Sequence, residues 1–556
     1  MIESIFPSTS IVTVDNLQVS AINRGVETVL VSGISFSVKK GEVLALIGES
    51  GSGKTTIAMA LMGYVRYGCR ITEGRIRVAD QQVREMSPAQ LRQLRGNEIA
   101  YIAQSAASSF NPGMTIMDQV IEPVVIHHTM TRVEARAKAI TLFRELALPS
   151  PETIGDRYPH QVSGGQLQRL MTAMALMGDP QVIILDEPTT ALDVTTQVEV
   201  LKAFRRVVSQ RGMTAIYVSH DLAVVAQMAD HIMVLQQGAI VEHGPTRELL
   251  TEAKASYTGQ LLDAAQHASR PTSWLRENDD LQPLLEVRDL AVGYGARDRE
   301  GVPKIRILEE INLQLWRGQS IGIIGESGSG KTTLAHAIAG LNPAWRGHLL
   351  FNHHYISSEL TARLPEELQQ IQYVFQMADT ALNPAHTVGD ILSRPLKHFR
   401  QLQGKALANE ISDLLALVKL PASLQYRKPA SLSGGQKQRV NLARALAARP
   451  EIIICDEVTS ALDTVVAAAI LDLISELRRE LQLSVLFISH DMQAIRAVCD
   501  DIVVMKQGRI VTQLASEDYS KPSNNLYFER LKRAVPELRQ GWLDEHQDSY
   551  KAELYY

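Results

Sequence analysis

The chain has 556 residues, 45% of them hydrophobic, and a formal net charge of −5. This length and apolar content predict more than one globular domain, and the acidic balance disfavours nucleic acid as a partner. Three scattered cysteines without CxxC spacing indicate neither a disulfide framework nor a cysteine cluster. No apolar run approaches the roughly 20 residues of a membrane-spanning helix, and the N-terminus lacks an export signal. We therefore expect a cytosolic protein.

A glycine-rich loop, GESGSGKT at residues 48–55, follows the apolar run Val43–Ile47 and precedes a helix-forming stretch near Ile57. Its glycines allow the backbone N–H groups to surround a polyphosphate, and the helix start adds further donors. In such a loop Lys54 reaches the β and γ phosphates, and the Thr55 hydroxyl takes one coordination position on Mg²⁺. The loop predicts a nucleoside triphosphate site rather than a simple turn.

A helical segment is expected between this loop and the later motifs. Thr131 and Glu134 form a capping box at its start. Apolar residues at spacings of three and four predict one buried face. Its members are Val133, Ala137, Ile140, Phe143 and Ala147, and the second half of the chain offers Leu407, Ile411, Leu414 and Val418.

Polar residues collect where apolar strands end. Asp186 and Glu187 end one strand, His220 ends the next, and Gln104 follows an earlier one. Strands separated by helices, with polar residues at the strand ends, indicate an α/β fold with a parallel sheet and a ligand at its carboxyl edge.

The second half of the chain repeats the first. The loop GESGSGKT returns at residues 325–332, and Gln376 corresponds to Gln104. SGGQ occurs at residues 163–166 and 433–436, and ALD at residues 191–193 and 461–463. From SGGQ to the histidine that ends the series, His220 or His490, the motifs keep the same spacing in both halves. We predict a first domain at residues 1–263, a linker at 264–283, a second domain at 284–515 and a polar tail at 516–556.

The repeated polar residues predict a hydrolytic site in each half. Asp186 and Asp456 are expected to hold Mg²⁺, and Glu187 and Glu457 to orient or deprotonate the attacking water. His220 and His490 are placed to bond the γ phosphate, and Gln104 and Gln376 to contact Mg²⁺ or the water. Acidic pairs also cap helices, and single histidines are often structural; the repetition favours the catalytic interpretation.

Taken together, GESGSGKT, the glutamine, SGGQ, the DE pair, ALD and the histidine resemble an ATP-binding cassette (ABC) ATPase, twice over. The resemblance implies two tandem P-loop NTPase domains, each with a RecA-like parallel sheet core, an antiparallel β lobe and an α-helical subdomain. It also implies that ATP and Mg²⁺ are bound crosswise. Lys54 and Thr55 then work with Ser433 and Gly435, and Lys331 and Thr332 with Ser163 and Gly165.

The residues that the resemblance assigns to ATP fall in matching sets. In the first half they are Gly48, Glu49, Ser50, Gly51, Ser52, Gly53, Lys54, Thr55, Thr56, Gln104, Ser163, Gly164, Gly165, Gln166 and Asp186. In the second half they are Tyr294, Gly325, Glu326, Ser327, Gly328, Ser329, Gly330, Lys331, Thr332, Thr333, Gln376, Ser433, Gly434, Gly435, Gln436 and Asp456. The Mg²⁺ set is Thr55, Gln104, Asp186, Thr332, Gln376 and Asp456, and the catalytic set is Glu187, His220, Glu457 and His490.

The two halves differ where the family usually stacks an aromatic ring on adenine. The second half has Tyr294 at this place, whereas the first half has Ala21. Base stacking contributes roughly 1–3 kcal/mol. We therefore predict weaker ATP binding at the first loop.

The finer resemblance is to ATPases of bacterial peptide and nickel importers, carried by GCRITEGRI, QSAASSFNP, IQYVFQ, ALNP and LSRPLKH. It implies two integral membrane permease subunits as partners, a periplasmic substrate-binding protein acting indirectly, and a place on the cytoplasmic face of the inner membrane. The four-cysteine cluster of longer peptide-class members is missing, which favours nickel or a metal chelate over peptides as the cargo. A soluble tandem cassette that acts on ribosomes or nucleic acid, similar to the ABC-F factors, is the alternative. Its long charged linker and basic character are not found here.

Overall fold

The computed structural model describes residues 10–23, 26–190, 192–266, 282–460 and 462–545, and these residues form two compact units. Unit 1 contains the described residues up to 266, together with 463–465 and 536–545; unit 2 contains the others. Most of the predicted linker, and Ala191 and Ala461 of the ALD segments, lie outside the described residues. The predicted tail is divided, with residues 516–535 in unit 2 and 536–545 in unit 1.

Unit 1 contains a four-stranded antiparallel sheet in the order β2-β1-β4-β5 and a six-stranded sheet in the order β10-β9-β3-β8-β7-β6. In the larger sheet all neighbouring strands are parallel except β10, which pairs antiparallel with β9. The strands are β1 (Ser10–Asn23), β2 (Val26–Lys39), β3 (Val43–Ile47), β4 (Cys69–Val78), β5 (Gln81–Gln82), β6 (Ile99–Ile102), β7 (Val182–Asp186), β8 (Thr214–Val218), β9 (His231–Gln236) and β10 (Ala239–Pro245).

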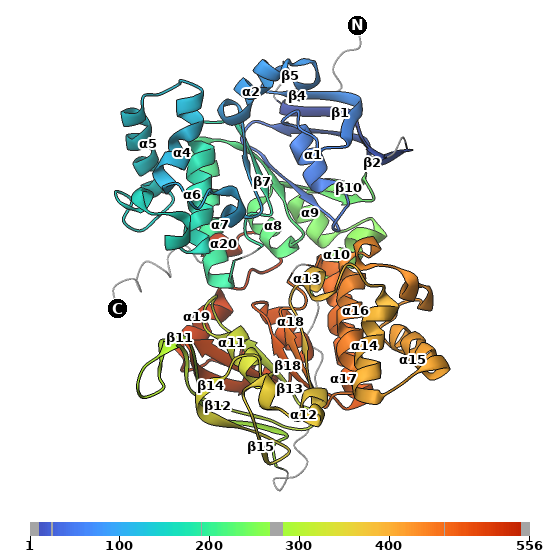
Figure 1. Cartoon of the computed structure of the whole chain (residues 1–556). Helices are drawn as coiled ribbons and strands as arrows, with labels where there is room; N and C mark the ends of the chain where they lie inside the picture. Colours follow the sequence, from blue (N-terminus) through green and yellow to red (C-terminus); the bar gives the residue numbers. More distant parts are fainter. Residues whose placement is uncertain (1–9, 24–25, 191, 267–281, 461, 546–556) are drawn as a thin grey trace. The chain divides into compact units, whose positions relative to one another are not determined.

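The helices of unit 1 cover the larger sheet and form a separate helical subdomain (Figure 1). They are α1 (Lys54–Ala60), α2 (Pro88–Asn97), α3 (Ala106–Ser109), α4 (Ile116–Ile126), α5 (Arg132–Glu145), α6 (Gly164–Leu176), α7 (Val194–Arg211), α8 (Leu222–Met228), α9 (Thr246–Thr251), α10 (Ser256–Ala265) and α20 (Trp542–Glu545). The first helix begins at Lys54, directly after Gly53, the last glycine of the loop, and slightly before the start expected from the sequence.

Unit 2 repeats this architecture. Its antiparallel sheet has the order β12-β11-β14-β15, and its larger sheet has the order β16-β17-β18-β13-β19-β20. The strands are β11 (Leu285–Arg297), β12 (Pro303–Leu315), β13 (Ser320–Ile324), β14 (Ala344–Phe351), β15 (His354–Ile356), β16 (Ile371–Val374), β17 (Ile452–Asp456), β18 (Ser484–Ile488), β19 (Asp501–Lys506) and β20 (Arg509–Ala515). The helices are α11 (Lys331–Ile338), α12 (Pro365–Gln370), α13 (Ala378–Ala381), α14 (Val388–Arg400), α15 (Gly404–Leu417), α16 (Gly434–Leu446), α17 (Thr464–Leu481), α18 (Met492–Val498) and α19 (Leu526–Arg533).

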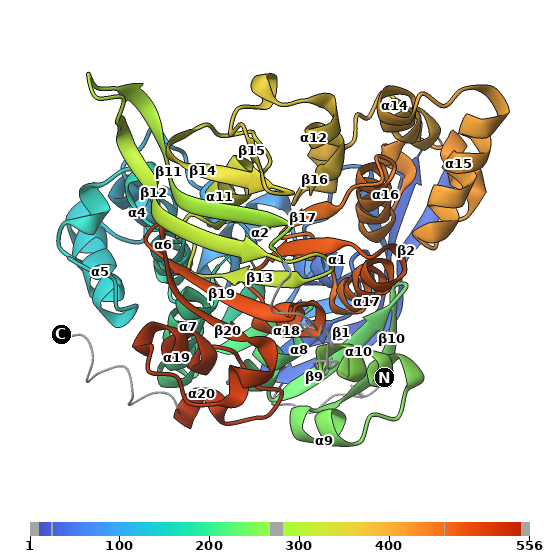
Figure 2. The same cartoon turned by 90° about the horizontal axis from the view of Figure 1, so that it is seen from below.

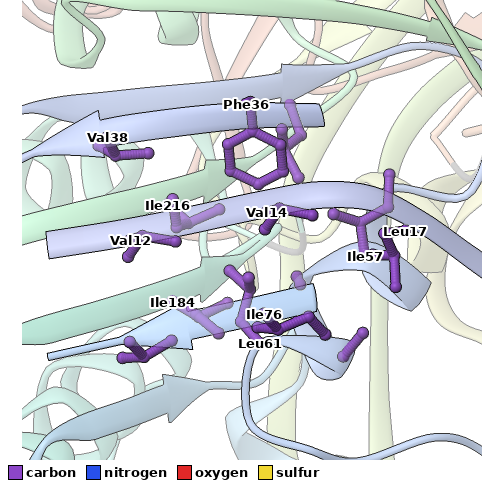
Figure 3. Close-up of a cluster of buried hydrophobic side chains, with 14 of the residues drawn as sticks. Val12, Val14, Leu17, Phe36, Val38, Ile57, Leu61, Ile76, Ile184 and Ile216 are labelled. Carbon is purple, nitrogen blue, oxygen red and sulfur yellow. The ribbon is translucent and has the colours of Figure 1, made fainter. Parts of the chain in front are cut away.

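The central strands are apolar on both faces because helices and the second sheet cover them. All five residues of β3 are buried, as are those of β7 and β8, which is typical of parallel strands inside an α/β domain. Figure 3 shows side chains of the antiparallel sheet, the larger sheet and α1 gathered in one cluster. Full burial of such a side chain contributes about 1.5–3 kcal/mol, so this cluster holds β3 and its following loop in place.

The helical subdomain of unit 1 corrects one prediction from the sequence. Helix α5 starts with the predicted Thr131–Glu134 capping box, but of the predicted stripe only Phe143 is buried, and Val133 is 81% exposed. The buried face instead contains Ala135, Ala139, Leu142 and Phe143. Both stripes have helical spacing, and packing against α4 and α6 selects the one with Leu142.

The corresponding face in unit 2 agrees better with the prediction. Ile411, Leu414 and Val418 are buried, and Leu407 is half-buried. Here α14, α15 and α16 pack against one another (Figure 2).

The last described segment, residues 536–545, packs on α8 within unit 1. Trp542 and Leu543 are fully buried there. The buried Gln227 side chain donates to the carbonyl oxygens of Glu537 and Arg539 at 2.8 and 2.7 Å, and its amide oxygen accepts the Leu543 N–H at 3.0 Å. A single side chain thus satisfies three backbone groups of this segment.

A search of the described residues finds no helix with the length and apolar character needed to cross a membrane.

Candidate functional site

The glycine loop of unit 1 connects the centre of the larger sheet to α1. The backbone at Gly48 has a φ of 147°, and a side chain there would meet the Leu235 carbonyl oxygen at 2.1 Å. Glycine is therefore required for the loop to lie against β9. The Lys54 ammonium is buried and donates to the carbonyl oxygens of Gly48 and Glu49 at 2.7 and 2.8 Å. Burial lowers the pKa of Lys54.

The loop of unit 2 has the same construction. Lys331 donates to the carbonyl oxygens of Gly325 and Glu326 at 2.8 and 3.0 Å, and it is also buried. A side chain at Gly325 would meet the Met505 carbonyl oxygen at 2.2 Å. The two loops therefore form the same tight turn around a buried lysine.

The carboxylate at the end of β7 lies beside the loop. The Thr55 hydroxyl donates to Oδ1 of Asp186 at 3.1 Å, and the Tyr101 hydroxyl donates to Oδ2 at 2.6 Å. Burial raises the pKa of Asp186, against the effect of these two hydrogen bonds. A hydroxyl and a carboxylate oxygen side by side are the hard ligands that Mg²⁺ prefers, and Mg²⁺ usually takes only one or two protein ligands.

Unit 2 repeats this donor set. The Thr332 hydroxyl donates to Oδ1 of Asp456 at 3.3 Å, and the Tyr373 hydroxyl donates to Oδ2 at 2.6 Å. Burial likewise raises the pKa of Asp456. The residues present therefore fit a Mg²⁺ ion in each unit.

Glu187 lies at the meeting point of three strands. Its Oε2 accepts a hydrogen bond from Gln104 after β6 at 2.9 Å, and its Oε1 lies 3.1 Å from Nδ1 of His220 after β8. The backbone at Glu187 has a φ of 48°, a left-handed conformation that costs energy in a non-glycine residue and is concentrated at functional sites.

The charges of this group depend on one another. Burial alone would raise the pKa of Glu187, but His220 and Lys54 lower it. Burial alone would lower the pKa of His220, but Glu187 raises it. The carboxylate therefore stays ionised and able to accept a proton from water, with its orientation fixed by Gln104 and His220.

The same contacts recur around Glu457 in unit 2. Gln376 donates to Oε2 at 2.6 Å, Nδ1 of His490 lies 3.6 Å from Oε1, and the φ of Glu457 is 47°. The structure thus brings the sequence-predicted glutamine, glutamate and histidine together in each unit.

The SGGQ segments form helix starts. Ser163 caps α6 and Ser433 caps α16, each by a box in which the serine hydroxyl accepts the N–H of the glutamine at the end of the motif at 3.3 Å. Both serines and the glycines that follow them, Gly164 and Gly434, are exposed. The next glycine has no room for a side chain, because a Cβ at Gly165 would meet Thr196 at 2.1 Å.

Tyr294 lies in β11 and is 42% exposed, with its hydroxyl 2.6 Å from the Asn342 amide nitrogen that donates to it. Ala21 lies in the corresponding strand β1. Of these two matching positions, the one in unit 2 has an exposed aromatic ring and the one in unit 1 does not.

Sequence reasoning did not single out Tyr101 and Tyr373, which hold the acidic residues at the strand ends. A signal was available, because each tyrosine precedes the glutamine of its own half, Gln104 or Gln376, by the same short interval.

A family model described as "ABC transporter" matches residues 31–190 and 308–460. The chain belongs to the ABC transporter family. It carries two ABC domains in one polypeptide, and it is an ATP-binding, ATP-hydrolysing protein. The two matched segments contain both glycine loops, both SGGQ segments and both acidic pairs.

Curated relatives match this ABC protein over almost its whole length. The Glutathione import ATP-binding protein GsiA of Escherichia coli strain K12 is 34% identical over 559 residues, covering 95% of this chain and 90% of the relative. The proteins of the same name from Shigella sonnei and Salmonella paratyphi A are 34% and 35% identical, with the same coverage. A solved structure of cbiO1 from Clostridium perfringens is described as part of the ABC transporter complex cbiONQ. It matches 43% of this chain and 90% of its own chain, with 27% identity and a TM-score of 0.39.

Proposed function

We propose that this chain is the energy-coupling ATPase of a bacterial importer whose cargo is peptide-like. The observation that carries the proposal is the full-length similarity to glutathione import ATP-binding proteins, 34% identical with 95% of this chain covered. The two complete sets of loop, acid pair, glutamine and histidine support it, because an importer that turns over ATP at two sites needs both.

The proposed roles of the residues follow from their contacts. Lys54 and Lys331 with the loop N–H groups bind the ATP phosphates. Thr55 with Asp186, and Thr332 with Asp456, hold Mg²⁺, which neutralises phosphate charge when it is bound. Glu187 and Glu457 orient and deprotonate the attacking water, and the neighbouring glutamine and histidine fix each carboxylate.

ATP binding and hydrolysis then change the relation between the ABC domains and drive the partners, since ATP stabilises one conformation over the other. The partners in this proposal are two integral membrane permease subunits at the cytoplasmic face of the inner membrane, with a periplasmic binding protein that selects the cargo. The crosswise pairing of loops and serines implied by the family resemblance stays a prediction.

The partner proposal is tested by purification of the tagged full-length chain from its own detergent-solubilised membranes. We expect integral membrane proteins to copurify in a fixed ratio to the chain. Recovery with ribosomes and without integral membrane proteins would support the ABC-F alternative and contradict this proposal.

The cargo is tested by uptake. Cells that lack the chain should take up labelled glutathione poorly, and the parent chain should restore uptake. The Glu187→Gln/Glu457→Gln variant should not restore it, whereas Glu248→Gln, an exposed change in α9, should. Restored uptake of Ni²⁺ but not of glutathione or small peptides would contradict the peptide-like cargo, which the names of the relatives favour over the nickel suggested by the missing cysteine cluster.

A further inference from the structure

The second residue of each glycine loop is held by a tyrosine that lies in the same unit but about 200 residues further along the chain. The Glu49 N–H donates to the Tyr257 hydroxyl oxygen at 3.1 Å. The Glu326 N–H donates to the Tyr527 hydroxyl oxygen, also at 3.1 Å. Each tyrosine follows the histidine of its own half at the same interval in the sequence. Tyr257 and Tyr527 thus belong to the part of the repeat in which the spacing is the same in both halves.

The helix that carries Tyr257 is fixed to the sheet. Tyr257 is the second residue of α10, and its ring is buried. The Glu242 carboxylate in β10 accepts the N–H groups of Lys254 and Ala255 at 2.9 and 3.1 Å, just before the helix begins. Burial raises the pKa of Tyr257 to about 12, so its hydroxyl stays protonated.

The helix that carries Tyr527 is fixed by different residues. Asn525 caps α19 by accepting the Phe528 N–H, and its amide nitrogen donates to the Val511 carbonyl oxygen in β20 at 2.9 Å. Phe528 is fully buried, and the Lys506 ammonium lies 4.8 Å from the centre of the Tyr527 ring. Both units therefore place a tyrosine hydroxyl against the loop, although different residues fix the two helices that carry the tyrosines.

The contact completes the support of the loop's first turn. The Glu49 carbonyl oxygen already accepts from Lys54, as does that of Gly48. With the Glu49 N–H bound by Tyr257, the peptide groups on both sides of this residue have a fixed orientation. A loop that is fixed before the ligand arrives loses less conformational freedom on binding, which increases affinity.

We propose that Tyr257 and Tyr527 are positioning residues that preorganise the two loops for ATP. They act through the Glu49 and Glu326 N–H groups and do not touch the phosphates in this proposal. The inference rests on the proposed nucleotide site at each loop, and it adds to that site a residue from a distant part of the sequence.

Substitution of phenylalanine tests the hydroxyl alone, because the ring and its packing remain. ATP binding to Tyr257→Phe is measured in a chain that also carries Lys331→Ala, so that the measured binding comes from the first loop. Binding to Tyr527→Phe is measured in a chain that also carries Lys54→Ala, so that it comes from the second loop. We expect the dissociation constant to rise about 3- to 10-fold in each, since one loop N–H loses its acceptor.

Kinetics and hydrogen exchange separate positioning from general stability. In the chain with intact lysines, each Tyr→Phe variant should raise the KM for ATP while kcat stays within about twofold. Amide exchange should become faster at residues 48–53 or 325–330 and stay unchanged elsewhere. Tyr64→Phe in unit 1 and Tyr519→Phe in unit 2 are the matched controls. Tyr64 lies under Arg95 and Tyr519 packs against Phe528, and neither control should change KM.

Three results would overturn the inference in distinguishable ways. Unchanged affinity in both Tyr→Phe variants, with binding still lost in the Lys54→Ala/Lys331→Ala chain, overturns the role of the tyrosines only. Equal changes in KM and kcat that the control variants reproduce show general destabilisation and overturn it as well. Parental ATP binding by the Lys54→Ala/Lys331→Ala chain overturns the nucleotide site itself.

Discussion

The Thr55 hydroxyl donates to Oδ1 of Asp186 at 3.1 Å, across 131 residues of sequence. The same pair recurs as Thr332 and Asp456 at 3.3 Å. The carboxylate of Asp186 is held by this hydroxyl, and burial raises its pKa. Both oxygens are the type that Mg²⁺ binds, so this contact is the Mg²⁺ site that we propose in each unit.

Loss of the threonine hydroxyl should therefore change the requirement for Mg²⁺. We expect Thr55→Ala/Thr332→Ala to need several-fold more Mg²⁺ for half-maximal ATP hydrolysis, because one ligand is lost in each unit. The measurement is a Mg²⁺ titration of ATPase activity at fixed ATP. Thr251→Ala, which removes an exposed hydroxyl from α9, is the control. A parental Mg²⁺ dependence in the double variant would contradict the assignment.

The two loops should differ in their affinity for ATP. Tyr294 offers an exposed ring in unit 2, whereas Ala21 offers none in unit 1. Stacking on adenine contributes roughly 1–3 kcal/mol, so Lys331→Ala, which leaves the first loop, should bind ATP about 5- to 150-fold more weakly than Lys54→Ala. Calorimetric titration measures both constants, and Tyr294→Ala should abolish the difference. Equal affinities of the two lysine variants would contradict the prediction.

The pairing of His220 with Glu187 predicts a pH dependence of stability. The pKa of His220 is raised in the folded chain, so its contribution to stability is complete below its ordinary value of 6.5 and is lost as pH rises through the folded-state pKa. The pKa of Glu187 is lowered, so its contribution is present above 4.5 and is lost as pH falls through the folded-state pKa.

The stabilising pair is therefore complete between these two limits. We expect the unfolding temperature of the parent to exceed that of His220→Gln most at about pH 6, and the difference to shrink as pH rises to about 9. His160→Gln, a change of an exposed histidine outside the site, should not show this trend. A difference that is constant or grows with pH would rule out the pairing as described.

The C-terminal segment should contribute to the stability of unit 1. Trp542 is 1% exposed in the segment whose backbone is bound by Gln227 of α8, and removal of a large buried aromatic side chain typically costs about 3–5 kcal/mol. We expect Trp542→Ala to lower the denaturant midpoint of unit 1, and Tyr67→Ala, at a fully exposed tyrosine, to leave it nearly unchanged. Equal midpoints for the two variants would show that the segment does not pack as described.

The polar residues at the strand ends could be predicted from the sequence because each of them closely follows an apolar run. The strand expected at Val43–Ile47 is β3, and Asp186, Glu187, His220 and Gln104 all lie at one edge of the sheet. Repetition strengthened these predictions, since Asp186, Glu187 and His220 all recur in the second half at one constant offset, which a chance pattern does not do.

The remaining features depend on tertiary packing that local patterns do not determine. Two apolar stripes of α5 have helical spacing, and only contact with α4 and α6 decides between them. Tyr101 meets Asp186 across 85 residues, and Tyr257 meets the loop across 208. A single tyrosine in a strand or helix carries no local sign of such a contact, and only its recurrence at the same interval in both halves marks it.

The central claim is that each half of the chain hydrolyses ATP through a glutamate held by a glutamine and a histidine. The direct test is steady-state ATP turnover of the full chain, alone and with its membrane partners, for Glu187→Gln, Glu457→Gln and the double variant. Because loss of a general base typically costs about 10²- to 10⁴-fold, we expect the double variant to fall by about 10²-fold or more. Each single variant should also lose activity, and Glu248→Gln should match the parent. Parental turnover in the double variant would contradict the account.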